Sequence, residues 1–168
     1  FNNQRAFYGD TRALLLQVEI IYTDGTRETW KTDESWKTSF GAITSSDIYD
    51  GETYDARLAT RGWKLATYAE SAAWVPVQAL PYPYDNLVGS QSPLVRKRER
   101  LKPQKISRTS TGDLIVDFGQ NMVGWVEISA QGEAGTTIIV EHAEVLDRDG
   151  NFYTTNLRSA KQRNRYVL

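Results

Sequence analysis

The sequence predicts an all-β protein built from antiparallel strands in β-sandwich or jelly-roll modules, with two modules expected. Three observations support this fold class. Apolar and polar residues alternate with a period of two in several short runs, Asp-Gly pairs separate some of the runs, and the runs recur at a spacing of roughly ten residues. Short strands with turn residues at that spacing are typical of β-sandwiches and barrels.

The first predicted strand covers residues 14–22, where apolar side chains occupy every second position from Leu16 onward. Its leucine content would also suit a helix, but the following residues favour a hairpin. The pair Asp24-Gly25 leads directly into a second alternating run at residues 27–32. Glycine adopts positive φ without steric cost, so Asp-Gly between two alternating runs is a strong hairpin signal.

The remaining strands are predicted in two groups. The first group comprises residues 36–40, 53–58 and 74–77, with an acidic loop at 45–52; the second comprises 102–108, 114–118, 123–130, 136–142, 143–146 and 165–168. Between the groups, residues 76–93 contain four prolines and almost no periodicity. This composition indicates a linker or a strap between modules.

Composition excludes several classes of function. The formal net charge of −1 offers no broad basic field for nucleic acid, and the single basic run, residues 96–102, is interrupted by Glu99 and Leu101. Cysteine is absent and His142 is the sole histidine, which excludes disulfides, thiolate catalysis and histidine-rich zinc sites. No run is apolar and long enough for a membrane span, and the cellular compartment stays open.

Two stretches of the chain have distinctive sequences: Asp-Gly-Glu-Thr-Tyr-Asp-Ala-Arg at residues 50–57 and Asp-Phe-Gly-Gln-Asn-Met-Val-Gly-Trp at residues 117–125. Both resemble signature sequences of bacterial α-L-rhamnosidases. Further matching stretches follow in the same order along the chain, at residues 8–10, 14–25, 32–36, 46–57, 62–63, 74, 116–125, 141–146 and 156–158. One such motif is weak evidence, whereas many in one order are specific for a family.

The resemblance implies a division into modules. Residues 1–78 correspond to the C-terminal part of the family's N-terminal β-sandwich, 79–93 to a linker or strap, and 94–168 to the start of a concanavalin-like β-sandwich. The family's catalytic domain is a separate helical (α/α) barrel in which paired glutamates hydrolyse terminal α-L-rhamnosyl groups with inversion. These 168 residues contain no part of that barrel, so no catalytic residue is expected here and the chain is expected to be a fragment.

The partners implied by the resemblance are the catalytic barrel of the same polypeptide and a rhamnose-containing carbohydrate, with neither nucleic acid nor membrane. In some family members the N-terminal sandwich binds rhamnose with the help of calcium. Calcium is therefore the one candidate cofactor, and two alternative functions stay open: a stand-alone carbohydrate-binding module and a purely structural spacer.

The segment of residues 47–55, which includes most of the acidic loop, is the candidate binding site. Its four carboxylates around one glycine could supply oxygen ligands to Ca²⁺ while a neighbouring tyrosine faces a sugar. The candidate calcium ligands are Asp47, Asp50, Glu52 and Asp55. The candidate carbohydrate-binding residues are Asp47, Asp50, Glu52, Tyr54 and Trp63. A rigid structural corner with an Asp55–Arg57 ion pair is the alternative interpretation.

The other tryptophans are predicted by default to be structural. Trp30, Trp36 and Trp125 lie in alternating runs and are expected in the core, because large aromatic side chains mostly bury their area. The polar turn at residues 117–121 is expected to close on its own backbone amides.

Overall fold

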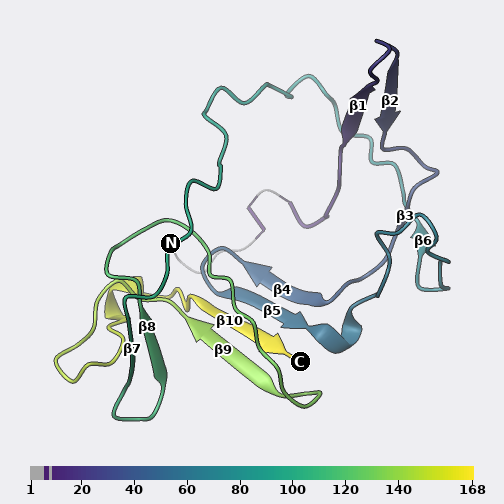
Figure 1. Cartoon of the computed structure of the whole chain (residues 1–168). Coiled ribbons are helices and arrows are strands. Elements are labelled where there is room, and N and C mark those ends of the chain that lie inside the picture. Colours follow the sequence, from purple (N-terminus) through teal and green to yellow (C-terminus); the bar gives the residue numbers. More distant parts are fainter. Residues whose placement is uncertain (1–5, 8) are drawn as a thin grey trace. The chain divides into compact units, whose positions relative to one another are not determined.

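The computed structural model describes residues 6–7 and 9–168, and it is all-β as predicted (Figure 1). Its helical residues, within the described part, are confined to two three-residue 3₁₀ turns, η1 (Ala56–Leu58) and η2 (Thr155–Leu157). The strands are β1 (Gln17–Ile21), β2 (Arg27–Lys31), β3 (Lys37–Thr38), β4 (Ile43–Asp47), β5 (Gly51–Asp55), β6 (Val75–Pro76), β7 (Lys105–Arg108), β8 (Leu114–Asp117), β9 (Thr137–Glu141) and β10 (Arg163–Val167).

The strands fall into two compact units that interleave along the chain. The first unit comprises residues up to Gly41 together with Thr60–Gly89, and it contains the two-stranded pairs β1–β2 and β3–β6. The second comprises Ala42–Ala59 and Ser90–Leu168, with the pair β7–β8 and a four-stranded sheet. The chain therefore passes between the units at three points.

In the first unit, β1 and β2 form the predicted antiparallel hairpin. Gly25 has a φ of 86°, and the backbone N–H of Tyr22 donates to the carbonyl oxygen of Thr26 at 2.9 Å. Val18 lies opposite Trp30 and Ile20 lies opposite Glu28, so the face that carries these residues is mostly apolar. Nothing described covers this face, and Trp30 is 58% exposed, so its prediction as a core residue is wrong.

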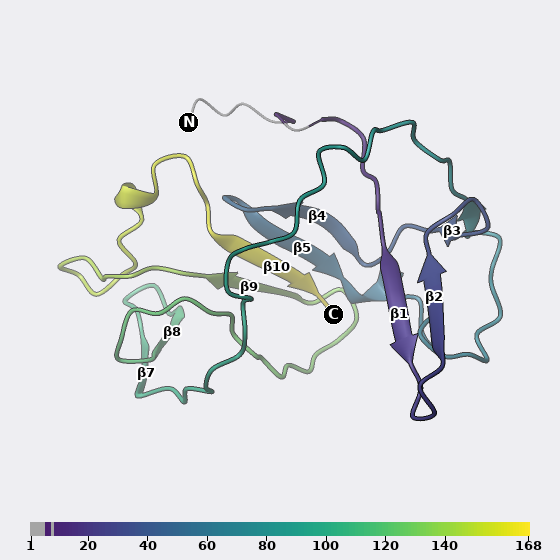
Figure 2. The same cartoon turned by 90° about the horizontal axis from the view of Figure 1, so that it is seen from above.

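The four-stranded sheet of the second unit has the order β4-β5-β10-β9 (Figure 2). Its outer pairs are antiparallel, whereas β5 and β10 run parallel, with Tyr54 opposite Tyr166. Parallel strands need a long connection between them, and here it runs from Asp55 to Arg163. Among the described strands, antiparallel pairing is thus the rule and β5–β10 is the exception.

The predicted acidic loop is largely strand. Residues 45–47 belong to β4, which pairs with β5 after a bulge between Ile43 and Ser45. The loop shrinks to a tight turn in which the Asp47 carboxylate accepts hydrogen bonds from the backbone N–H groups of Tyr49 and Asp50, at 2.8 and 3.0 Å. Local bonds of this kind let a carboxylate-rich segment form a hairpin.

Gly51 ends this turn with a φ of 93°, a conformation that favours glycine. A Cβ atom here would overlap the carbonyl oxygen of Arg163, and it would lie 2.8 Å from Asn164 Oδ1. Glycine is therefore needed for two reasons: the backbone conformation and the close approach of β10.

At the other end of β5, Asp55 caps η1. Its Oδ1 accepts from the backbone N–H of Arg57 at 3.0 Å, and its Oδ2 lies 2.7 Å from Arg57 Nη2. The hydrogen bond from the Arg57 side chain holds the pKa of Asp55 below its ordinary value and raises the pKa of Arg57. The predicted ion pair is confirmed, although Arg57 belongs to the 3₁₀ turn rather than to the strand.

Elsewhere in the second unit, β7 and β8 pair as predicted, and Asp117 Oδ1 closes the following turn by accepting from the N–H of Gly119 at 2.7 Å. Residues 123–130 do not form the predicted strand. An alternating sequence becomes a strand only beside a free strand edge, and no described segment pairs with this one. The strand predicted at 143–146 reduces to one bridge between Leu146 and Phe152.

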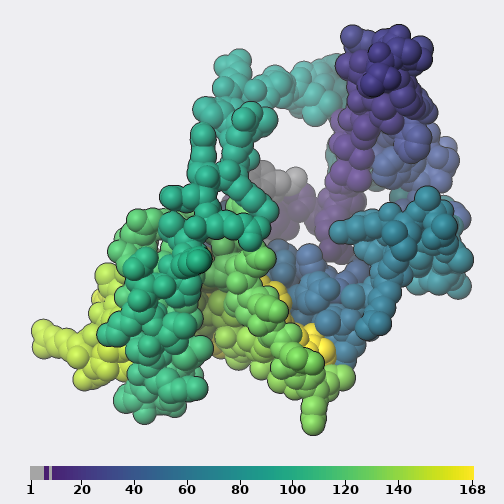
Figure 3. All heavy atoms as spheres, in the orientation of Figure 1, coloured from purple at the N-terminus to yellow at the C-terminus, as the bar shows by residue number. Residues whose placement is uncertain are grey.

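Few side chains are fully buried. Among the described hydrophobic residues, only Ala42, Ile115 and Val167 are, while Trp125 is 66% exposed, contrary to its prediction as core. The run of chain at residues 78–99, teal in Figure 3, exposes Tyr82, Val88 and Val95. Many large hydrophobic side chains in both units are exposed, so much apolar surface is uncovered.

No helix in the described part of the chain combines the length and the apolar character required to cross a membrane.

Replacing Gly51 by alanine should lower the free energy of unfolding of the second unit more than replacing Gly112 does. Gly112 has almost the same φ, 94° against 93°, but a Cβ there meets nothing within 4 Å. Strain alone predicts a loss of about 1 kcal/mol for Gly112→Ala, and overpacking adds roughly 1–3 kcal/mol for Gly51→Ala. Urea denaturation followed by circular dichroism measures both, and equal losses would contradict the crowding at Gly51.

The Asp55 cap should make stability fall in acid. Because its folded pKa lies below the unfolded one, the contribution is complete above a pH of about 4 and is lost as the pH falls through the folded pKa. Asp55→Asn should therefore narrow the difference in melting temperature between pH 7 and pH 3. Glu99→Gln, in the exposed basic run, is the control. If Asp55→Asn leaves the difference in melting temperature between pH 7 and pH 3 unchanged, the Asp55 cap does not contribute to the acid dependence.

Candidate functional site

The structure gathers the predicted acidic residues on one hairpin, β4–β5. Asp47 ends β4, Asp50 lies in the turn, and Glu52 and Asp55 belong to β5. Because side chains alternate along a strand, Glu52 and Tyr54 project from one face of β5 and Asp55 from the other. The four carboxylates therefore share a hairpin without converging on a single point.

Each of these acidic residues has a local role. Asp47 closes the turn, and Asp50 Oδ2 lies 3.9 Å from Lys161 Nζ. The N–H of Glu52 donates to Asn164 Oδ1 at 2.9 Å, and Asp55 is engaged by Arg57. Within residues 6–7 and 9–168, no three His, Cys, Asp or Glu side chains are grouped to hold a metal ion. The calcium site stays a prediction.

Trp63 belongs to the first unit, whereas the acidic hairpin belongs to the second. Its ring is 53% exposed, and Lys64 Nζ lies 5.4 Å from the ring centroid. This geometry keeps the indole accessible, as a sugar platform requires.

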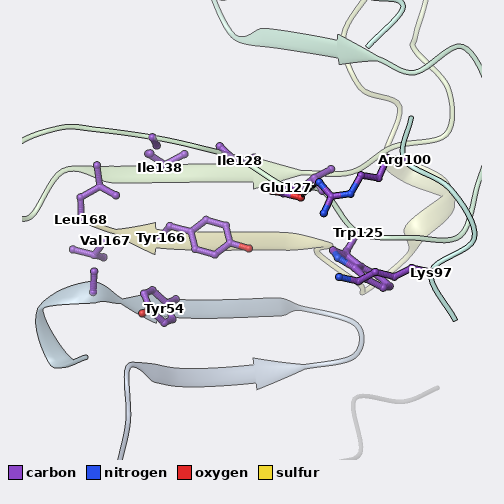
Figure 4. A pocket seen from close by; sticks show the side chains of 13 residues that line it. Tyr54, Lys97, Arg100, Trp125, Glu127, Ile128, Ile138, Tyr166, Val167 and Leu168 are labelled. Carbon is purple, nitrogen blue, oxygen red and sulfur yellow. Dashed lines mark ion pairs between the residues drawn. The ribbon is translucent and has the colours of Figure 1, made fainter. Parts of the chain in front are cut away.

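The second unit contains a pocket of about 670 Å³ on one face of its four-stranded sheet (Figure 4). Tyr54, Tyr166 and Ile138 form its floor, because they lie side by side on β5, β10 and β9. Leu168 and Val167 lie at one end (Figure 4). Tyr54 is therefore the one predicted carbohydrate-binding residue that lines this pocket.

The other end of the pocket is charged and aromatic. Arg100 Nη1 lies 2.9 Å from Glu127 Oε2, and Lys97 Nζ lies 5.4 Å from the centroid of the Trp125 ring. All four residues lie at the same end in Figure 4. Lys97 and Arg100 belong to the basic run. Trp125 and Glu127 belong to residues 123–130, which pair with no described strand.

This arrangement suits binding better than hydrolysis. Aromatic rings pack against the apolar face of a sugar, and the ion pair offers donors and acceptors for hydroxyl groups. Hydrolysis of a glycosidic bond uses two carboxyl groups in most enzymes, whereas Glu127 is the single acidic residue among those lining the pocket. The described pocket therefore lacks a carboxylate pair.

Trp125 and Tyr166 were not among the predicted site residues. Trp125 lies in an alternating run, which favoured a core position, and Tyr166 reaches the pocket through a parallel pairing with β5. Alternation along each strand does predict that Tyr54 and Tyr166 lie on a half-buried face. It carries no information about which strands are neighbours.

Comparison with known proteins gives two family matches. The α-L-rhamnosidase N-terminal domain family matches residues 1–99, and the bacterial α-L-rhamnosidase concanavalin-like domain family matches residues 107–168. Together they account for most of the chain.

Individual relatives agree. An α-L-rhamnosidase of Streptomyces avermitilis is 40% identical over 162 residues, which are 96% of this chain and 16% of the relative. One from Formosa agariphila is 35% identical over 143 residues, covering 85% and 15%. The chain thus spans about one sixth of the length of these curated relatives.

Solved structures show the same fold. The native α-L-rhamnosidase of Aspergillus terreus superposes with a TM-score of 0.86 at 38% identity, over 96% of this chain and 18% of that one. The Streptomyces avermitilis enzyme, solved in complex with L-rhamnose, gives a TM-score of 0.83 at 40% identity, over 96% and 16%. The sequence resemblance is thereby confirmed: this chain belongs to the α-L-rhamnosidase family, with an N-terminal domain followed by a concanavalin-like domain.

Proposed function

We propose that this chain is an accessory, non-catalytic β-region of an α-L-rhamnosidase, a glycoside hydrolase that removes terminal α-L-rhamnosyl groups with inversion. One observation carries the proposal: 96% of the chain aligns with the Streptomyces avermitilis enzyme, yet this is 16% of that enzyme. The single acidic residue in the described pocket, Glu127, agrees with a reaction centre elsewhere in the polypeptide.

Support of the catalytic domain is the main role that we propose. The apolar face of β1–β2 and the apolar residues of 78–99 are uncovered, and exposed apolar patches of this kind mark surfaces that dock other protein segments. The rest of the enzyme is the partner to which we assign them. A spacer that only holds the catalytic domain in place needs no further site.

L-Rhamnose binding is the second role, and the pocket of the second unit favours it. Tyr54, Tyr166 and Trp125 present aromatic surface beside the Arg100–Glu127 ion pair. The complex of the Streptomyces avermitilis enzyme with L-rhamnose makes this sugar the first ligand to test. The predicted site at Asp47, Asp50, Glu52 and Trp63, and calcium at Asp47, Asp50, Glu52 and Asp55, form the competing proposal.

The complete protein that carries this chain should release L-rhamnose from an aryl α-L-rhamnoside, and the 168-residue chain alone should release none. Proton NMR of the first product should show the β-anomer, because inversion changes the configuration at the anomeric carbon. Turnover by the isolated chain would contradict the non-catalytic assignment, and an initial α-anomer would contradict inversion.

Calorimetric titration with L-rhamnose, with glucose as control sugar, should give millimolar or tighter binding that Tyr54→Ala or Trp125→Ala weakens about tenfold. Trp63→Ala is the matched aromatic control for the pocket. Loss of binding in Trp63→Ala would favour the competing site that includes Trp63, and binding that a chelator abolishes would favour the calcium site at Asp47, Asp50, Glu52 and Asp55. If the folded protein gives no heat with either sugar, the spacer role is the one that remains.

A further inference from the structure

The boundary between the two matched families does not coincide with the boundary between sheets. The first family match ends at residue 99, and the second begins at residue 107. Yet β4 and β5, well inside the first match, belong to the same sheet as β9 and β10, which lie inside the second. In Figures 1 and 2 the four strands lie side by side.

The contact between β5 and β10 continues beyond the three paired positions of the strands. The carbonyl oxygen of Tyr49 accepts from the N–H groups of Lys161 and Gln162, both at 3.0 Å, and that of Asp50 accepts from Arg163 at 3.2 Å. Backbone bonds thus run from the β4–β5 turn along β10. Such bonds are made only when the two edges are in one fixed register.

Side chains fix the same register. The N–H of Glu52 donates to Asn164 Oδ1 at 2.9 Å, a bond between residues 112 positions apart. Gly51 leaves room for the Arg163 carbonyl, which a Cβ atom would displace. The contact between β5 and β10 is therefore specific for this hairpin, because most other strands would bring a side chain to the position of Gly51.

Burial also depends on the hairpin. Val167 of β10 is 7% exposed, and Ala42 at the start of the hairpin is 9% exposed. They are two of the three fully buried hydrophobic residues in the described chain. Removal of the hairpin would uncover Val167 and leave the parallel edge of β10 without a partner, and unpaired sheet edges are sites of non-native association.

We propose that the concanavalin-like region folds on a hairpin supplied by the N-terminal region: the edge of β10 is a strand-binding surface, and residues 42–59 are its occupant. The two families of sequence thus form one cooperative unit at this sheet. The proposal concerns assembly of the region, and it holds whether or not the protein hydrolyses rhamnosides.

A single cut tests it. A specific protease site inserted into the full chain between Glu99 and Leu101 separates the hairpin from β9 and β10 covalently while leaving both intact. After native cleavage, the two fragments should elute together in size-exclusion chromatography. Separate elution of folded fragments would overturn the proposal.

Two variants, with a third as control, show whether the contact between β5 and β10 holds the fragments together. Gly51→Ala should weaken their association by at least tenfold, whereas Gly112→Ala, with nearly the same φ and no crowding, should leave it unchanged. Asn164→Ala, a milder change, should weaken it about tenfold through loss of the Glu52 hydrogen bond. If neither Gly51→Ala nor Asn164→Ala weakens the association, the fragments are held together at another contact and the proposal is overturned.

Hydrogen exchange of the uncut chain covers the case in which Gly51→Ala prevents assembly altogether. The amides of Tyr166 and Val167 should lose protection in Gly51→Ala, while those of the β1–β2 hairpin keep theirs. Unchanged protection of β10 would refute the dependence of β10 on the hairpin directly.

Discussion

The parallel pairing of β5 with β10 is the interaction on which the rest of the second unit depends. It closes a connection of more than a hundred residues, and such closure carries an entropic cost that local hairpins avoid. Backbone bonds from Tyr49, Asp50 and Glu52, together with the burial of Val167, offset that cost. Local turns then complete the sheet around this pair at little further expense in entropy.

A second constraint is the shortage of covered apolar surface. A sheet face is stable when another layer packs against it, and the faces of β1–β2 and of the pocket lack such a layer among the described residues. The open face around Tyr54 and Tyr166 leaves room for the pocket, for which sugar binding is proposed. Support of the catalytic domain is proposed for the exposed apolar side chains of β1–β2 and of residues 78–99, so the two proposed roles concern different surfaces.

The sequence alone predicted what depends on neighbours in the chain. The Asp24-Gly25 hairpin, the pair β7–β8 and the Asp55–Arg57 ion pair follow from alternation, glycine and charge within a few residues. The signature stretches at residues 50–57 and 117–125 identified the family. The candidate Tyr54 lies in the pocket, and Trp63 does not.

What the sequence could not predict depends on distant partners. Alternation at residues 123–130 indicated a strand, but a strand also needs an edge to pair with, and none of the described segments provides one. Likewise, no periodicity links Tyr54 to Tyr166, and the turn and cap hydrogen bonds that engage the carboxylates of Asp47 and Asp55 depend on backbone geometry. The chemistry of single side chains could be predicted from the sequence, whereas the pairing of distant segments could not.

The three passages of the chain between its units have an evolutionary consequence. Segments that are contiguous in sequence can be moved between genes by one recombination event at each end. Here the first unit is interrupted by residues 42–59, which belong with the C-terminal sheet. An exchange at the family boundary near residues 99–107 would bring in a concanavalin-like sheet with a foreign hairpin, so the two regions are expected to be inherited together, with matched residues at Gly51 and Asn164.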